Sequence, residues 1–231
     1  MPLAEHTTRP TLPVGLPVVE TFHSLQGEGA HAGRSAFFLR LGGCSVGCPW
    51  CDTKASWPKD VHPLRPLAAL AEEAAAAAAA GAAFVVITGG EPLHHPLGEL
   101  CSVLRQANRP PLALHLETSG VDPLSGDFDW ITLSPKRHRP PTRELLAACH
   151  ELKVVIHEPE DLVFAETMAN AARTARSEDG PAATAPAQPG PELLLQPGWG
   201  SAGGQALAVD FVRRHPSWRL SLQTHKWLGV R

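Results

Sequence analysis

Phe84-Val85-Val86-Ile87-Thr88-Gly89-Gly90-Glu91-Pro92 is an apolar run that ends in an abrupt turn. Short, fully apolar runs are typical of strands that are buried on both faces of a parallel sheet. The two glycines allow the backbone to approach a ligand closely at the strand end, where open α/β sheets bind their substrates. The segment therefore predicts an α/β protein whose functional groups gather at the carboxyl ends of its strands.

Strand and helix patterns alternate on both sides of this segment. We expect strands over residues 17–26, 35–41, 84–87, 112–117, 129–133, 151–156, 192–196 and 218–222. Helices are expected over residues 64–83, 97–106, 142–150, 160–175 and 203–214. Strands that are separated by helices form right-handed βαβ units, so the sheet is predicted to be parallel. The length suits a single domain that spans residues 1–231.

Three segments fall outside this alternation. Residues 1–17 are rich in proline and are expected to form a loose N-terminal arm. Residues 176–191 are rich in Ala, Pro and Gly and are expected to form a flexible surface insertion. Residues 223–231 follow the last strand directly, so we expect this C-terminal tail to reach the active site.

The composition excludes several classes of protein. The net charge of −3 offers no general attraction to nucleic acid. No apolar stretch is long enough to span a membrane, and the N-terminus lacks the pattern of a signal peptide. Three of the five cysteines lie within eight residues, which is typical of a metal site in a reducing compartment. We therefore expect a cytoplasmic protein without a nucleic-acid or membrane partner.

Cys44-Ser45-Val46-Gly47-Cys48-Pro49-Trp50-Cys51 places three thiols in a loop directly after a predicted strand. Three thiolates on a 4Fe-4S cluster leave one iron without a protein ligand and open to a small molecule. A structural zinc site would need a fourth ligand, such as a distant histidine, and it remains the alternative. Cys101 and Cys149 are expected to be buried free thiols.

The Cys-x3-Cys-x2-Cys loop after one strand, with Gly-Gly-Glu-Pro after the next, resembles the radical S-adenosylmethionine (SAM) superfamily. The resemblance covers nearly the whole chain and implies a partial, incomplete parallel β/α barrel. It also implies that the open iron binds the amino and carboxylate groups of SAM, and that reduction of SAM generates a 5′-deoxyadenosyl radical. Because this radical begins the reaction, no side chain is assigned as a certain catalytic group.

Five further motifs resemble the 7-carboxy-7-deazaguanine synthase family: Ser24-Leu25-Gln26-Gly27-Glu28-Gly29, Cys51-Asp52-Thr53, Glu117-Thr118-Ser119-Gly120, Ser134-Pro135-Lys136 and Gln223-Thr224-His225-Lys226. Members are lyases that contract 6-carboxy-5,6,7,8-tetrahydropterin to 7-carboxy-7-deazaguanine with release of ammonia, in the biosynthesis of queuosine and other 7-deazapurines. The resemblance implies a 4Fe-4S cluster, SAM and Mg²⁺ as cofactors. It also implies a pterin substrate, an electron donor such as flavodoxin or ferredoxin, and a homodimer.

The same resemblance implies a role for each residue at a matching position. Substrate contacts are expected from Leu25, Gln26, Gly27, Glu28, Arg40, Thr88, His225 and Arg231. SAM contacts are expected from Trp50, Gly90, Glu91, Glu117, Ser134, Pro135, Lys136 and Gln196. The cluster is expected on Cys44, Cys48 and Cys51, and the Mg²⁺ on Thr53.

Several of these roles have a competing interpretation. Strand alternation directs Arg40 away from the neighbouring leucines, and its planar guanidinium suits a substrate carboxylate. Thr53 alternatively caps the turn after the cysteine loop. Glu117 and Lys136 alternatively face solvent at strand ends, and His225 alternatively lies on the surface of the tail.

The tail raises one more expectation. Residues 223–231 contain no Asp or Glu that could pair with the guanidine-like edge of a pterin. We therefore expect the α-carboxylate of Arg231, rather than its guanidinium, to bind that edge.

Two other functions remain open. Another radical SAM enzyme, such as an activase that forms a glycyl radical on a partner protein, would share the cysteine loop, although the tail favours a small buried substrate. A non-catalytic iron-sulfur or zinc protein would share the cysteines but would leave the Gly-Gly-Glu-Pro turn without a function.

Overall fold

The computed structural model describes residues 15–179 and 190–231 of the chain. Within these residues a nine-stranded sheet has the order β3-β1-β2-β4-β5-β6-β7-β8-β9. The strands are β1 (Gly15–Leu25), β2 (Ser35–Leu41), β3 (Leu64–Pro66), β4 (Phe84–Gly89), β5 (Ala113–Thr118), β6 (Trp130–Leu133), β7 (Glu151–Ile156), β8 (Glu192–Pro197) and β9 (Trp218–Leu220).

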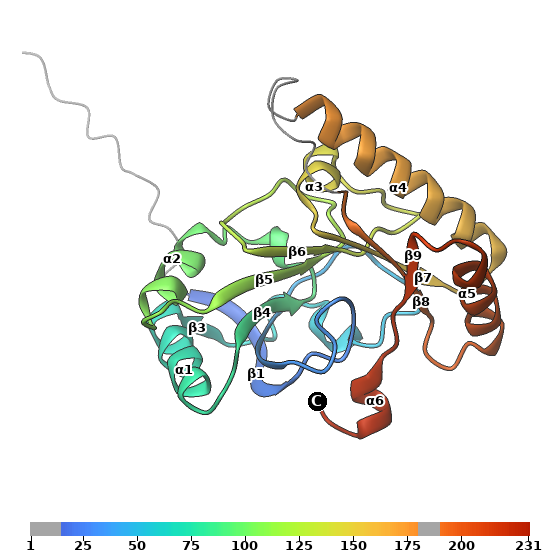
Figure 1. Ribbon diagram of the computed structural model, residues 1–231. Coiled ribbons are helices and arrows are strands. Elements are labelled where there is room, and N and C mark those ends of the chain that lie inside the picture. The colour runs from blue at the N-terminus through green and yellow to red at the C-terminus, as the bar shows by residue number, and fades with distance from the viewer. Residues whose placement is uncertain (1–14, 180–189) are drawn as a thin grey trace, which may run out of the picture.

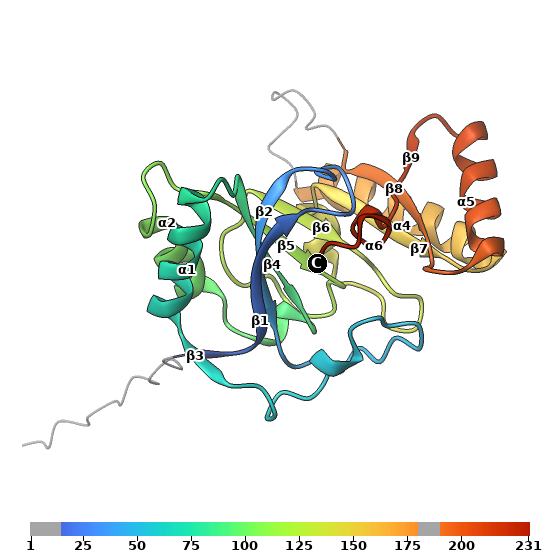
Figure 2. The same cartoon turned by 90° about the horizontal axis from the view of Figure 1, so that it is seen from below.

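Most of the sheet is parallel. Neighbouring strands from β2 to β9 pair in parallel, whereas β1 pairs antiparallel with both β2 and β3. The sheet curves strongly but stays open, with β3 and β9 as its edges (Figures 1 and 2). This architecture confirms the predicted partial parallel β/α barrel.

Helices cover the outer face of the curved sheet, as Figure 1 shows for α1, α2, α4 and α5. The α-helices are α1 (Leu67–Ala79), α2 (Gly98–Gln106), α3 (Arg143–Ala148), α4 (Pro159–Asp179), α5 (Ala202–Arg214) and α6 (Thr224–Leu228). Two short 3-10 helices are η1 (Lys54–Ser56) and η2 (Pro92–His94). In the described part of the chain, none of the helices combines the length and apolarity needed to cross a membrane.

The central strand β4 is buried on both faces, as its apolar run predicts. Val85 and Ile87 pack into the main core between the sheet and the outer helices. Phe84 and Val86 join Phe38 of β2 in a second apolar cluster. Because side chains alternate along a strand, these two clusters lie on opposite faces of the sheet.

The predicted helix over residues 64–83 is wrong at both ends. Leu64–Pro66 forms β3, which pairs with the beginning of β1. Arg65 precedes a proline, and the proline ring disfavours helical backbone in the preceding residue. The helix then runs over Leu67–Ala79 and is followed by Gly81, which has a positive φ of 104°.

The boundaries of two of the three outlying segments also need correction. Residues 1–14 and 180–189 lie outside the described residues, but residues 15–17 already belong to β1 and residues 176–179 to α4. Arg176 donates a hydrogen bond to the carbonyl of Cys149, so the end of α4 is packed against the domain. The tail forms the short helix α6, which lies between β1 and the β8–β9 edge on the concave side of the sheet (Figures 1 and 2).

Candidate active site

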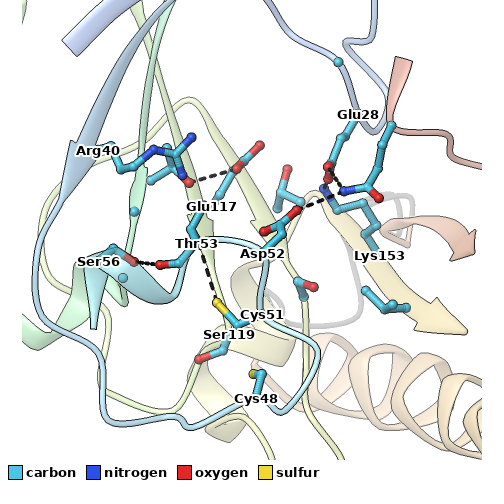
Figure 3. A pocket seen from close by; sticks show the side chains of 18 of the residues that line it. Glu28, Arg40, Cys48, Cys51, Asp52, Thr53, Ser56, Glu117, Ser119 and Lys153 are labelled. Carbon is cyan, nitrogen blue, oxygen red and sulfur yellow. Dashed lines mark hydrogen bonds and ion pairs between the residues drawn. The ribbon is translucent and has the colours of Figure 1, made fainter. Parts of the chain in front are cut away.

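A cavity of about 610 Å³ opens at the carboxyl ends of the strands. Its walls come from the loop after β1, the cysteine loop, the ends of β4 to β8, and the tail (Figure 3). All but one of the predicted site residues line it: Leu25, Gln26, Gly27, Glu28, Arg40, Cys44, Cys48, Trp50, Cys51, Thr53, Thr88, Gly90, Glu91, Glu117, Ser134, Lys136, Gln196, His225 and Arg231. The exception is Pro135, which is buried behind the wall.

The cysteine loop follows β2 and is fastened to the segment after it. The backbone amide of Cys44 donates to the carbonyl of Trp57 at 2.9 Å. The indole Nε1 of the same tryptophan donates to the Sγ of Cys51 at 3.3 Å. The thiols of Cys44, Cys48 and Cys51 are half-buried and line the cavity together.

The surroundings of these thiols suit thiolate ligands. Burial raises the pKa of the Cys44 thiol, but the backbone amides of Val46 and Gly47 oppose this by favouring its thiolate. Burial also raises the pKa of Cys48, and the ammonium of Lys136 opposes it. Within the described residues no three His, Cys, Asp or Glu side chains gather around one metal-ion position. The fit to an iron-sulfur cluster therefore rests on the three thiols and on the donors beside them.

The Gly-Gly turn after β4 holds the cysteine loop in place. The amide of Gly90 donates to Leu41 at 2.8 Å, and the amide of Glu91 donates to Gly43 at 2.9 Å. A Cβ at Gly90 would lie 2.3 Å from the carbonyl oxygen of Gly43, and Gly89 has a positive φ of 131°. The glycines are therefore needed because the backbone of this turn packs directly against the backbone after β2, and not only because a ligand approaches it.

Glu91 connects this turn to the end of β5. Its side chain is almost fully buried, with 1% exposed. One carboxylate oxygen accepts from the amide of Leu93 at 3.1 Å and from the hydroxyl of Thr118 at 2.5 Å. The other accepts from the amide and the hydroxyl of Ser119 at 2.8 and 2.5 Å. These four hydrogen bonds occupy both oxygens of the carboxylate.

Glu117 at the end of β5 orients two other predicted site residues. Its Oε1 accepts from the side-chain amide of Gln26 at 2.9 Å, and its Oε2 accepts from the hydroxyl of Thr88 at 3.0 Å. Both donors are buried. Glu117 therefore faces the cavity, and the solvent-facing alternative is wrong for this residue.

Glu28 is held in the wall of the cavity by an ion pair with Lys153 of β7 (Figure 3). The Nζ–Oε2 distance is 2.7 Å, and the carboxylate also accepts from Gln196 at 3.0 Å and Gln223 at 2.9 Å. Burial alone would raise the pKa of Glu28, but the ammonium and the hydrogen bonds lower it to about 2. Burial alone would lower the pKa of Lys153, but the carboxylates of Glu28, Glu117 and Glu151 hold it above its usual value.

Lys136 is a second ammonium in the cavity. It donates to the hydroxyl of Ser134 at 2.8 Å, and burial lowers its pKa. Among the described residues no carboxylate lies within ion-pair distance of it. Its positive charge is therefore available to an anionic group in the cavity.

Thr53 follows the cysteine loop and directly precedes η1, at its N-cap position. Its hydroxyl makes no capping hydrogen bond to that helix, so the capping alternative is wrong. The hydroxyl instead lies 3.6 Å from the Sγ of Cys51 and lines the cavity.

The tail closes over the loop after β1. The amide and hydroxyl of Thr224 both donate to the carbonyl of Gly27 at 2.9 Å. A Cβ at Gly27 would lie 2.1 Å from the Nδ1 of His225, so the loop has room for the imidazole only because residue 27 is glycine. Lys226 pairs with Asp52 of the cysteine loop at 2.6 Å.

The middle of β1 and the end of β2 meet the tail at a group of charges. Arg40 donates through Nε to Glu20 at 3.1 Å, and Arg231 donates through Nη1 to the same carboxylate at 2.8 Å. The main-chain oxygen of Arg231 accepts from the hydroxyl of Ser24 at 2.6 Å. The guanidinium and the main-chain oxygen of Arg231 thus both have protein partners. The predicted binding of the pterin edge by its α-carboxylate stays a prediction.

Sequence reasoning gave no role to four charged residues of the site, although Asp52 and Lys226 stand in two of the sequence motifs. Glu20, Asp52, Lys153 and Lys226 all line the cavity, and each pairs with a residue that is distant in the sequence. Strand alternation offered one signal, because Glu151 and Lys153 share the face of β7 opposite its apolar residues Leu152, Val154 and Ile156. A lysine buried in a strand is rare unless it is paired.

An open parallel barrel with a three-thiol loop at the ends of its strands defines a protein of the radical SAM superfamily. Residues 39–152 match the family model of the radical SAM superfamily. The chain is therefore a radical SAM enzyme, whose cofactors are a 4Fe-4S cluster and SAM. The other thiols, Cys101 and Cys149, are buried away from the loop, as predicted.

Within this superfamily the chain is similar in sequence to one family of enzymes. A 7-carboxy-7-deazaguanine synthase of Prochlorococcus marinus is 55% identical over 225 residues, which cover 93% of this chain and 98% of the relative. That of Synechocystis is 47% identical over 95% of this chain and 96% of the relative. The crystal structure of QueE from Escherichia coli superposes with a TM-score of 0.71 at 27% identity, covering 91% of this chain and 94% of that chain. The chain belongs to the 7-carboxy-7-deazaguanine synthase family.

We expect Cys48→Ala to lose most of the bound iron and all turnover, because a cluster needs all three thiolates. Cys101→Ala is the matched control, since its thiol is buried in α2 away from the cavity. Iron content and the visible spectrum of the anaerobically purified proteins provide the measurement. Full iron occupancy in Cys48→Ala would contradict the assignment.

We expect Glu28→Gln to reduce the free energy of unfolding at neutral pH by about 3–5 kcal/mol, because Lys153 would be left as an unpaired buried charge. The pKa of Glu28 is depressed to about 2, so its stabilisation is complete above 4.5 and is lost as the pH falls toward 2. The difference between wild type and variant should therefore shrink over that range.

Urea unfolding at several pH values measures this difference. Because acid removes the cluster from both proteins, the relevant quantity is the difference in free energy of unfolding between wild type and Glu28→Gln. Glu72→Gln, on the exposed face of α1, is the control and should follow the wild type. If the difference in free energy of unfolding between wild type and variant stayed constant down to acid pH, the stabilisation would not come from the charge of Glu28.

Proposed function

We propose that this chain contracts 6-carboxy-5,6,7,8-tetrahydropterin to 7-carboxy-7-deazaguanine with release of ammonia, in the biosynthesis of 7-deazapurines. The observation that carries the proposal is the cavity, in which all predicted site residues except Pro135 converge although they are scattered over the sequence. The length over which the chain matches 7-carboxy-7-deazaguanine synthases supports it.

Cys44, Cys48 and Cys51 would hold the cluster, which, with SAM bound to its open iron, supplies the 5′-deoxyadenosyl radical. The chain's own part is to position SAM beside it. Lys136 offers a positive charge without a carboxylate partner among the described residues, and Ser134 and Gln196 line the same wall. Glu91 is saturated by protein donors, so we infer that it shapes the SAM site through the Gly-Gly turn and does not bind SAM itself.

The opposite wall suits the pterin. Gln26 and Thr88 are fixed by Glu117. The resemblance implied that Glu117 contacts SAM, but because it binds two expected substrate contacts we propose that its carboxylate accepts hydrogen bonds from ring N–H groups of the pterin. Arg40 offers a guanidinium to the carboxylate of the substrate. His225 and the tail would cover the substrate and exclude water.

Thr53 would be a ligand of Mg²⁺. Its hydroxyl lines the cavity and has no capping role. A hard cation of this kind takes few protein oxygens and completes its shell with water and substrate oxygens.

The remaining partners are proposals that follow from the family. The enzyme would receive electrons from a small carrier such as flavodoxin or ferredoxin, would act in the cytoplasm and would form a homodimer. A glycyl-radical activase is the less favoured alternative, because the tail lies across the cavity through contacts with Gly27 and Asp52 and leaves little room for a protein loop.

Anaerobic incubation with a reductant, SAM, Mg²⁺ and 6-carboxy-tetrahydropterin tests the proposed function. We expect the deazapurine chromophore to appear and ammonia to be released in equal amount. SAM cleavage without this product would argue for a different radical SAM reaction.

We expect Arg40→Lys to raise the KM for the pterin roughly tenfold, because an ammonium cannot form the two parallel hydrogen bonds of a guanidinium to a carboxylate. A tetrahydropterin that lacks the 6-carboxylate should bind wild type and variant equally in a competition assay. Equal weakening of both ligands would give Arg40 a structural role only.

A further inference from the structure

We propose that Glu20 is a positioning residue that holds Arg40 in place for the carboxylate of the substrate and neutralises part of the positive charge of that site. The proposal deepens the function proposed above and rests on it. None of the sequence motifs includes Glu20, which lies in the middle of β1.

The strand register places Glu20 beside Arg40. The two residues are partners in the antiparallel pairing of β1 with β2, directly after an irregularity between Val18 and Glu20. Phe22, two residues further along β1, stacks on Phe38 with ring centroids 4.9 Å apart. Because alternate residues share a face, Glu20 and Arg40 continue this stack toward the mouth of the cavity.

Each oxygen of the Glu20 carboxylate binds one guanidinium. Oε1 accepts from the Nε of Arg40 at 3.1 Å, and Oε2 accepts from Arg231 at 2.8 Å. Both guanidinium carbons lie 5.9 Å from the centroid of the Phe22 ring. The carboxylate thus separates two cations that would otherwise repel each other over the same aromatic ring.

This arrangement leaves one edge of Arg40 unused. An arginine has five N–H donors, and Glu20 takes only the one on Nε. Among the described residues the two terminal nitrogens have no hydrogen-bond partner, and the side chain lines the cavity with 20% of its surface exposed. The terminal edge can therefore bind a carboxylate through two parallel hydrogen bonds while Glu20 fixes the opposite end of the group.

Glu20 also sets the charge of the site. The side chains of Arg40, Glu20 and Arg231 together carry one positive charge, which the α-carboxylate of Arg231 beside Ser24 balances, so removal of the Glu20 carboxylate would leave the site with a net positive charge. A more positive site favours ions with two negative charges over a single carboxylate. Glu20 would thereby help the enzyme to reject inorganic phosphate.

The test is a double-mutant cycle between Glu20→Gln and Arg40→Lys, with Glu72→Gln as the control. We expect Glu20→Gln to raise the KM for 6-carboxy-tetrahydropterin roughly tenfold, the size of one lost charge-assisted hydrogen bond, with little change in kcat. In the Arg40→Lys background the same change should have almost no further effect, because Glu20 acts through Arg40. Iron content and SAM binding should stay at the wild-type level.

Calorimetric titration with inorganic phosphate tests the charge role without turnover. We expect Glu20→Gln to bind phosphate several-fold more tightly than wild type and Glu72→Gln. Additive effects in the cycle, or an unchanged phosphate affinity, would overturn the proposal. Failure of the wild type to form the deazapurine would instead overturn the proposed function, and the phosphate titration would still decide the role of Glu20.

Discussion

Parallel pairing from β2 to β9 brings the carboxyl ends of seven strands to one edge of the sheet, and the whole site depends on this constraint. Each strand end delivers a short polar segment to the same cavity. The thiols follow β2, the Gly-Gly turn begins with the last residue of β4, and Glu117 is the last residue but one of β5. Because the sheet stays open, the tail can reach across its mouth from β9 to β1.

Buried and half-buried carboxylates of the chain itself hold this edge together. Glu91 joins the turn after β4 to the end of β5, and Glu117 joins β5 to β4 and to the loop after β1. Glu28 joins that loop to β7, β8 and the tail. A buried carboxylate without donors is strongly unfavourable, so each of these groups fixes the position of its neighbours. The cavity is therefore shaped before a ligand enters.

Contacts between segments that are distant in the sequence explain which sequence expectations were wrong. The interpretation of Leu64–Pro66 as helix followed local composition, but this short segment pairs with β1 at the edge of the sheet. For Thr53 the alternative was a cap of an isolated turn, and for Glu117 it was a solvent-facing side chain at a strand end. The alternatives fail because Thr53 does not cap its helix and because Glu117 has donors on two other segments.

The sequence by itself determined the alternation of strands and helices, the three-thiol loop and the glycine turn. These features depend on residues close together in the chain, where hydrophobic period and spacing are directly visible. The tertiary structure alone decided that Glu28 pairs with Lys153, 125 residues away, and that Glu20 lies between two arginines. Such pairings depend on strand order and register, because a buried charge is stabilised only by the partner that the fold brings to it.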